Sequence, residues 1–187
     1  MQVVARRIGV LVMFLATACG GPGSDLAPLP NGKAGPYGLG PGDQVRIITF
    51  GEENLTGEFR VNDSGNIALP LVGAVHAAGL TSSQLETAVG AALRRGNLVQ
   101  HPSVAVEIIV YRPIFVLGEV NKPGQYPYQP GMTVVTAVAV AGGFTYRAIE
   151  GYAAVVRNVG GIAVEGRVDR QAFVQPGDVI TVFERRF

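Results

Sequence analysis

The chain of 187 residues has no tryptophan, one cysteine and two histidines, and only 16% of its residues are charged. A single cysteine cannot form an internal disulfide, so the folded state must depend on its apolar core. The histidines, His76 and His101, are far apart in the sequence, and no cysteine–histidine pair has the spacing of a metal site. These shortages predict a protein with no metal centre.

The chain also has no marked excess of positive or negative charge. The 15 Lys and Arg residues nearly balance the 14 Asp and Glu residues, and no basic cluster could form a phosphate-binding face. We therefore expect no nucleic-acid partner. The adjacent pair Glu52 and Glu53 is typical of a solvated loop rather than of a glycosidase site. Ser64 lies in a turn-like Asp-Ser-Gly-Asn stretch that does not have the spacing of a nucleophile elbow. An enzyme is therefore not expected, and no catalytic residue is assigned.

The composition favours strands and turns. Glycine (26) and proline (12) are frequent, and 48% of the residues are hydrophobic, many of them in short Val- and Ile-rich runs. The length suits one domain or two small ones. We expect a strand-rich globular protein rather than a helical bundle or a disordered chain.

The N-terminus has the order of segments found in an export signal. Arg6 and Arg7 precede the apolar residues 8–15, and small residues at 16–18 lead to Cys19. The apolar run is far shorter than the roughly 20 residues that span a bilayer. The sequence "LATAC" resembles the bacterial lipobox, although its leucine lies one position further from the cysteine than usual. This resemblance implies a signal peptide over 1–18 and acylation of Cys19, with a buried or incidental cysteine as the alternative.

Residues 19–36 are rich in Gly, Pro and small polar residues. A segment of this composition buries too little apolar area to offset chain entropy, so we interpret it as a flexible tether. Gly20 follows Cys19 directly, which by resemblance to enterobacterial sorting favours the outer membrane over the inner one. The expected location is the periplasmic face of the outer membrane, through a lipid anchor.

The clearest helix signal lies between residues 80 and 96. Thr81 and Gln84 have the spacing of a capping box, and Gly96 can end the helix. One face carries apolar residues at helical spacing: Leu85, Ala88, Val89 and Ala92. Alternating apolar residues predict strands around 45–49 and 104–108 and a hairpin about the turn at 62–65.

A second pattern begins at Arg112 and Pro113, and it predicts the order β-β-α-β-β-β. The stretch 130–144 is ambiguous because its valines also suit a strand, but Thr133 can cap a helix, and we favour a helix. A hairpin is expected about Gly160 and Gly161. Pro-Gly-Asp followed by a strand occurs twice, at Pro41 and at Pro176, but two matching turns do not establish a repeat.

Several motifs in series resemble one known family. "GPGD" at 40–43, the pattern V-x-x-x-G-x-I-x-x-P-x-x-G over 61–73 and the following "GLT" are similar to the export domain of the outer-membrane polysaccharide export family. "VLGEVNKPGQYPY", "AGG" and the terminal "PGDVITV" are similar to that family's soluble-ligand-binding β-grasp (SLBB) module. The resemblance implies an α+β fold with a strand-rich polysaccharide export domain over 37–111 and one SLBB-like β-grasp domain over 112–187.

The resemblance also implies a function, one that needs no catalytic residue and no bound cofactor. Members of the family form lipid-anchored homo-oligomeric rings that enclose a conduit for capsular polysaccharide or exopolysaccharide, and they engage an inner-membrane polysaccharide co-polymerase. Longer members carry a C-terminal amphipathic helix that forms the outer-membrane pore, whereas this sequence stops at "FERRF". We therefore expect a short form that works with a separate outer-membrane pore, such as a β-barrel.

A different class of function stays open at this stage. The β-grasp part could bind a glycan or a small ligand while the lipid only localises the protein. Tyr111, Arg112 and Tyr146 are aromatic and basic residues of the kind that contact sugars, but the sequence assigns no role to them. A receptor of this kind would be monomeric and would bind its ligand saturably, whereas the export protein would form rings.

Overall fold

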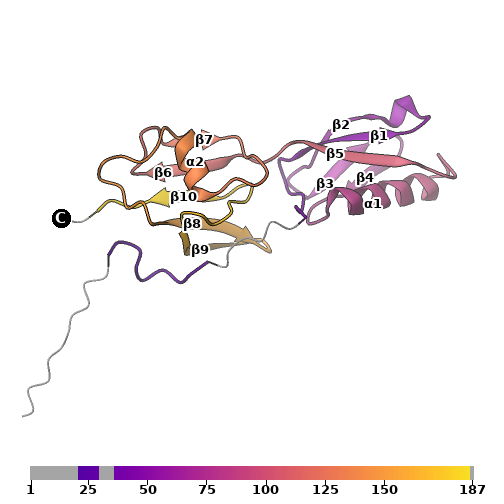
Figure 1. Ribbon diagram of the computed structural model, residues 1–187. Coiled ribbons are helices and arrows are strands. Elements are labelled where there is room, and N and C mark those ends of the chain that lie inside the picture. The colour runs from indigo at the N-terminus through magenta and orange to yellow at the C-terminus, as the bar shows by residue number, and fades with distance from the viewer. Residues whose placement is uncertain (1–20, 30–35, 186–187) are drawn as a thin grey trace, which may run out of the picture.

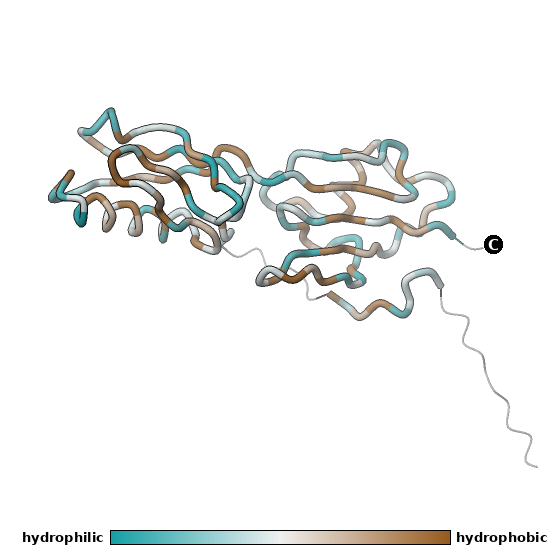
Figure 2. The backbone as a smooth tube through the Cα atoms, turned by 180° about the vertical axis from the view of Figure 1, so that it is seen from behind, coloured by the Kyte–Doolittle hydropathy of each residue, from teal (hydrophilic) through white to brown (hydrophobic). Residues whose placement is uncertain are grey.

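The computed structural model describes residues 21–29 and 36–185, which form two parts lying end to end (Figure 1). Each part has its own cluster of buried apolar residues. Cys19 and the predicted signal peptide lie outside the described residues. Within the described ranges, no helix has the length and apolar character needed to cross a membrane. Among the described residues, hydrophobic stretches recur along the strands of both parts (Figure 2).

The first part packs one helix against two small antiparallel sheets. The central strand β1 lies between β2 and β5, and a separate hairpin is formed by β3 and β4. The hairpin predicted about the turn at 62–65 is therefore wrong, because β2 before that turn pairs with β1 and β3 after it pairs with β4. A single 3-10 turn, η1, follows β1. The bounds are β1 Gln44–Thr49, η1 Glu53–Leu55, β2 Gly57–Arg60, β3 Asn66–Leu69, β4 Gly73–His76, α1 Ser82–Arg95 and β5 Val104–Val110.

Helix α1 begins as its sequence predicts. The Thr81 hydroxyl accepts a hydrogen bond from the Gln84 backbone N–H at 3.2 Å, and Gln84 Oε1 accepts one from the Thr81 N–H at 2.9 Å. Gly96 is the C-cap, but it keeps right-handed backbone angles, and the left-handed φ of 53° falls on Asn97 instead. Asparagine tolerates this conformation, so the helix ends without a left-handed glycine. The predicted apolar face lies in or against the core: Leu85, Ala88, Val89 and Ala92.

The second part is a five-stranded mixed sheet in the order β7-β6-β10-β8-β9, and α2 packs across it (Figure 1). The pair of β6 and β10 is parallel, while the other neighbours are antiparallel. The predicted order β-β-α-β-β-β is confirmed, including the helix in the ambiguous stretch, which Thr133 caps. The bounds are β6 Ile114–Gly118, β7 Gly124–Tyr126, α2 Val134–Val140, β8 Tyr152–Val159, β9 Ile162–Asp169 and β10 Val179–Val182.

Residues 27–29 of the predicted tether are bound to the second part of the molecule rather than free. The Leu29 N–H donates to the Arg167 carbonyl, and the Arg167 N–H donates to the Ala27 carbonyl, both at 2.9 Å, so residues 27–29 extend the sheet beyond β9. Leu29 is only 6% exposed and belongs to the apolar core of this part. A Cβ at Gly166 would lie 2.9 Å from the Leu29 side chain, so the glycine makes room for the segment. The composition of 19–36 concealed this contact because one buried leucine is enough to hold a short segment on an unpaired strand edge.

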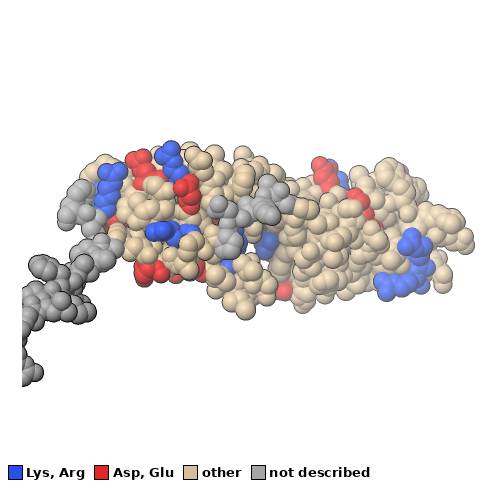
Figure 3. All heavy atoms as spheres, turned by 60° about the horizontal axis from the view of Figure 1, so that its bottom comes forward, with Lys and Arg blue, Asp and Glu red and all other residues tan. Residues whose placement is uncertain are grey.

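Charge is mixed over the surface. On the face shown in Figure 3, positive and negative side chains of the described residues are interspersed over the second part, and no extended basic area is seen there. Both parts have exposed ion pairs, such as Arg46 with Glu58 at 2.9 Å in the first part and Arg185 with Glu150 at 3.8 Å in the second. Exposed pairs of this kind contribute little to stability.

Candidate functional site

The two Pro-Gly-Asp sequences form the same turn, one at the entrance to β1 and one at the entrance to β10. The Asp43 N–H donates to the Gly40 carbonyl at 3.1 Å, and the Asp178 N–H donates to the Gln175 carbonyl at 3.0 Å. The glycine at the third position has a φ of 99° at Gly42 and of 90° at Gly177. Proline at the second position and a left-handed glycine at the third are the requirements of a type II turn. The repeated tripeptide is therefore a repeated structure.

Asp43 is fully buried and holds the connection between the two parts. Its Oδ1 accepts a hydrogen bond from the backbone N–H of Arg112 at 2.8 Å. Its Oδ2 accepts from the Tyr37 hydroxyl at 2.6 Å and from the Gly40 N–H at 2.7 Å. The Arg112 guanidinium covers Gly40 so closely that a Cβ there would lie 2.7 Å from Arg112 Cζ. The first turn thus ties the strand β1 to the linker that leaves β5.

Asp178, which is 1% exposed, holds a buried arginine. Arg157 donates from Nε to Oδ1 at 2.9 Å and from Nη2 to Oδ2 at 2.6 Å, which is a bidentate pair. Arg157 Nη2 also donates to the Phe173 carbonyl at 3.1 Å. The second turn reaches the linker as well, because the Gly177 N–H donates to the Pro113 carbonyl at 3.1 Å. The two turns therefore bind successive residues of the linker, Arg112 and Pro113.

Three tyrosines form a row across this joint. The rings of Tyr37 and Tyr111 are 5.2 Å apart and those of Tyr111 and Tyr128 are 5.5 Å apart, both edge to face. The Tyr37 hydroxyl accepts hydrogen bonds from Arg112 Nη2 at 2.7 Å and Nε at 3.1 Å while it donates to Asp43. Burial raises the pKa of Tyr37 well above its ordinary value, and the hydrogen bond to Asp43 adds to the rise. Burial also raises the pKa of Tyr128, so both phenols stay protonated near neutral pH.

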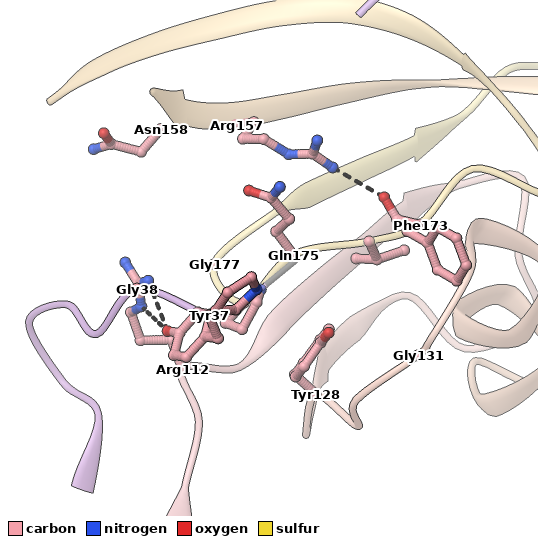
Figure 4. A pocket seen from close by; sticks show the side chains of 13 residues that line it. Tyr37, Gly38, Arg112, Tyr128, Gly131, Arg157, Asn158, Phe173, Gln175 and Gly177 are labelled. Carbon is pink, nitrogen blue, oxygen red and sulfur yellow. Dashed lines mark hydrogen bonds between the residues drawn. The ribbon is translucent and has the colours of Figure 1, made fainter. Parts of the chain in front are cut away.

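A pocket of about 450 Å³ opens at the joint, with walls from both parts (Figure 4). Its charged lining residues are Arg112 and Arg157, and no carboxylate is among the described residues that line it. Three aromatic side chains, Tyr37, Tyr128 and Phe173, and the amides of Asn158 and Gln175 form much of the remaining wall. Such a surface is rich in hydrogen-bond donors and suits a polar ligand with acceptor oxygens.

The structure brings few of the residues singled out from the sequence to this pocket. Tyr111 and Arg112 lie at the joint, whereas Tyr146 is 86% exposed outside the pocket lining. His76, His101, Glu52 and Glu53 are all exposed. Among the described residues, no group of three or more His, Cys, Asp or Glu side chains could hold a metal ion. Sequence reasoning missed Arg157 and Asp178, for which the repeated Pro-Gly-Asp was the available signal.

Models of two known families match the chain in succession. Residues 31–109 match the family described as polysaccharide biosynthesis/export protein, and residues 113–168 match the SLBB domain. The boundary between the two matches falls at the linker that the two turns hold. The α+β fold and the order of the two domains are as expected from the sequence.

Three relatives support the same assignment. The exopolysaccharide production protein ExoF of Rhizobium meliloti is 34% identical over 142 residues, which are 70% of this chain and 32% of ExoF. The EPS I polysaccharide export outer membrane protein EpsA of Ralstonia solanacearum is 30% identical over 138 residues, 59% of this chain and 36% of EpsA. The polysialic acid transport protein KpsD of Escherichia coli is 30% identical over 109 residues, 57% of this chain and 19% of KpsD.

The chain spans about a third of the length of ExoF and EpsA and about a fifth of that of KpsD. The family is described as a polysaccharide biosynthesis/export protein, and EpsA is named for export, ExoF for exopolysaccharide production and KpsD for transport; none of these descriptions names an enzymatic activity. With a matching export domain, a matching SLBB domain and the linker between them, the chain belongs to the polysaccharide export protein family.

Proposed function

We propose that this protein is a periplasm-facing lipoprotein of the outer membrane that forms part of the conduit for capsular polysaccharide or exopolysaccharide. The observation that carries the proposal is the succession of the export and SLBB matches over residues 31–168. Similar proteins are named for exopolysaccharide production, polysaccharide export and polysialic acid transport. The working form is a homo-oligomeric ring that receives polymer from an inner-membrane co-polymerase.

Acylation at Cys19 is the proposed attachment to the membrane, and the bound N-terminal segment gives it a geometric consequence. The Pro22 carbonyl accepts a hydrogen bond from the Tyr152 hydroxyl at 2.9 Å. A Cβ at Gly23 would lie 2.5 Å from the Phe183 ring, so the chain passes directly over that ring. Two residue steps separate Cys19 from Gly21, and an extended step spans at most about 3.6 Å. A lipid on Cys19 would hold the Tyr152 and Phe183 end of the SLBB domain close to the membrane surface.

The test is surface polysaccharide in a deletion strain that is complemented with the wild-type gene or with Cys19→Ser. We expect the deletion to abolish surface polymer, the wild-type gene to restore it, and Cys19→Ser to restore little while the protein accumulates in the soluble periplasmic fraction. Normal surface polymer in the deletion strain, in the absence of a second copy of the gene, would refute the proposal. Full rescue by Cys19→Ser would refute only the role of the anchor.

The ring is tested separately by native mass spectrometry of the purified full chain. A single higher-order species is expected, whereas a protein that stays monomeric at all concentrations would favour the alternative of a lipid-anchored glycan- or ligand-binding module. The separate outer-membrane pore stays a prediction, which conductance measurements on bilayers holding the purified protein would check.

A further inference from the structure

We infer that the pocket at the joint binds a carboxylate-bearing sugar, such as one uronic acid unit of an acidic polysaccharide. That the ligand is a sugar rather than another carboxylate rests on the proposed function. The carboxylate itself is inferred from the chemistry of the pocket wall. The pocket has walls from the linker and from the SLBB domain, with Tyr37 and Gly38 at one edge (Figure 4).

The first argument is the sign of the charge that faces the pocket. Arg112 and Arg157 line it, while the acids that neutralise them, Asp43 and Asp178, are 0% and 1% exposed and stand behind the wall. A ligand in the pocket therefore meets two guanidinium groups and no carboxylate of the described residues. Guanidinium groups pair with carboxylates through short, directional hydrogen bonds.

The second argument is that both guanidinium groups are already fixed in place. Arg157 uses Nε and Nη2 for Asp178 and Phe173, and Arg112 uses Nε and Nη2 for Tyr37. No described residue accepts a hydrogen bond from Nη1 of either arginine. Both side chains line the pocket, and the Arg157 side chain keeps 7% of its surface exposed while that of Arg112 keeps 27%. A ligand would gain these donors without ordering the side chains first, which favours binding.

The third argument concerns the remaining wall and the size of the pocket. The rings of Tyr128 and Phe173 offer flat apolar surfaces, and the Gln175 side chain has no hydrogen-bond partner among the described residues. Asn158 uses its Oδ1 for the Gly161 N–H, which leaves its amide N–H groups as donors. Sugars present both apolar C–H faces and hydroxyl oxygens, and a volume of about 450 Å³ is in the range of pockets for small ligands.

The experiment titrates the purified full chain with D-glucuronate, D-glucose and acetate, and follows binding by calorimetry or by ligand-observed NMR. D-Glucuronate should bind with a dissociation constant on the order of 1 mM, as expected for a ligand of this size. Glucose tests for hydroxyl recognition alone, and acetate tests for carboxylate recognition alone. Both should bind at least tenfold more weakly than D-glucuronate.

Gln175→Glu places a carboxylate in the pocket without removing a hydrogen bond of the described residues. It should weaken D-glucuronate binding about tenfold or more, because like charges placed together oppose binding. Gln171→Glu is the matched control: it makes the same change at an exposed position of the same loop outside the pocket, and it should leave binding within about twofold. Asn158→Asp, at another lining position, keeps the acceptor for Gly161 and should act like Gln175→Glu. Thermal unfolding checks that each variant is folded.

The outcomes separate this inference from the proposed function. Equal binding of glucose, equal binding of acetate, no binding of D-glucuronate, or unchanged binding to both pocket variants would each overturn the inference. Because binding is measured on the isolated protein, failure here with normal complementation of surface polymer leaves the export function standing. Specific binding with no export defect in the deletion strain refutes the export function and keeps the site.

Discussion

The two Pro-Gly-Asp turns have the same hydrogen bonds within the turn, but their carboxylates bind different groups outside it. Asp43 accepts from two backbone N–H groups and a tyrosine hydroxyl, and one of those N–H groups belongs to the linker residue Arg112. Asp178 instead pairs with a buried guanidinium from its own sheet, that of Arg157. The first carboxylate therefore connects the export domain to the linker, and the second holds the SLBB domain together. One local motif serves as a joint in one place and as a core element in the other.

The largest expected effect comes from breaking the buried pair in the SLBB domain. Asp178→Ala leaves the Arg157 guanidinium buried without its counter-charge, which typically costs about 3–5 kcal/mol of unfolding free energy. Urea denaturation should measure this loss of unfolding free energy. Hydrogen exchange should locate it in strands β8 and β10, with the export domain little changed. Exposed Asp169→Ala on β9 is the comparison variant. A loss below about 1 kcal/mol, the usual range for an exposed pair, would show that Arg157 finds another partner, and the contrast between the turns would fail.

Leu29→Ala should produce the next largest effect, and it also acts on the SLBB domain. Truncating a buried leucine removes about 2–3 kcal/mol or more, although a segment near a chain end can relax and lower the cost. The exchange protection of the Arg167 N–H, which donates to the Ala27 carbonyl, should fall with it. Leu26→Ala, outside the buried core, is the matched control in the same segment. Unchanged protection at Arg167 would mean that Leu29 is not the residue that holds 27–29 on β9.

Asp43→Asn tests the joint itself, with a smaller effect on stability. The amide keeps the size of the carboxylate but weakens the hydrogen bonds and replaces one acceptor oxygen by a donor. That donor faces either the Arg112 N–H or the Tyr37 hydroxyl and Gly40 N–H. The expected cost is about 1–3 kcal/mol. More telling is the relative orientation of the domains, which small-angle scattering or residual dipolar couplings should show to become variable. Asp63→Asn in the exposed turn between β2 and β3 should change neither quantity. If the domain orientation stays fixed in Asp43→Asn, the row of tyrosines rather than the Asp43 carboxylate keeps the joint rigid.

Most elements of both domains could be predicted from the sequence because their signals are local, although the predicted pairing of β2 with β3 is wrong. The capping box at Thr81 and the apolar face of α1 lie within one segment, and so does each turn and strand of the β-β-α-β-β-β order in the SLBB part. The joint could not be predicted, because the hydrogen bond between Asp43 and Arg112 joins residues 69 positions apart and that between Arg157 and Asp178 joins residues 21 positions apart. The repeated Pro-Gly-Asp predicted two turns but not the partners of their carboxylates. Leu29 was hidden for the same reason, since its partner strand lies far along the chain.

The smallest expected effect is a pH dependence of the joint. The pKa of Tyr37 is raised in the folded protein above its ordinary value of 10.0, first by burial and then by the hydrogen bond to Asp43. A raised pKa of this kind contributes stability that is fully present below about pH 10 and is lost as the pH rises further, because the unfolded chain then releases the proton more readily. Wild type should therefore lose stability between about pH 10 and 12 more steeply than Tyr37→Phe, which has no such proton to lose.

Tyr37→Phe itself should cost about 1 kcal/mol near neutral pH, since it removes the hydroxyl that joins Asp43 to Arg112. Tyr146→Phe, at an exposed position outside the joint, is the matched control for removal of a phenol. Tyr128 also has a raised pKa, so part of the alkaline loss should persist in Tyr37→Phe and disappear only in the double variant with Tyr128→Phe. Parallel alkaline stability curves for wild type and Tyr37→Phe would mean that the Tyr37 phenol ionises in the folded joint as easily as in the unfolded chain. The joint would then depend on the backbone hydrogen bonds of Asp43 alone, and the two turns would differ less than their hydrogen-bond partners indicate.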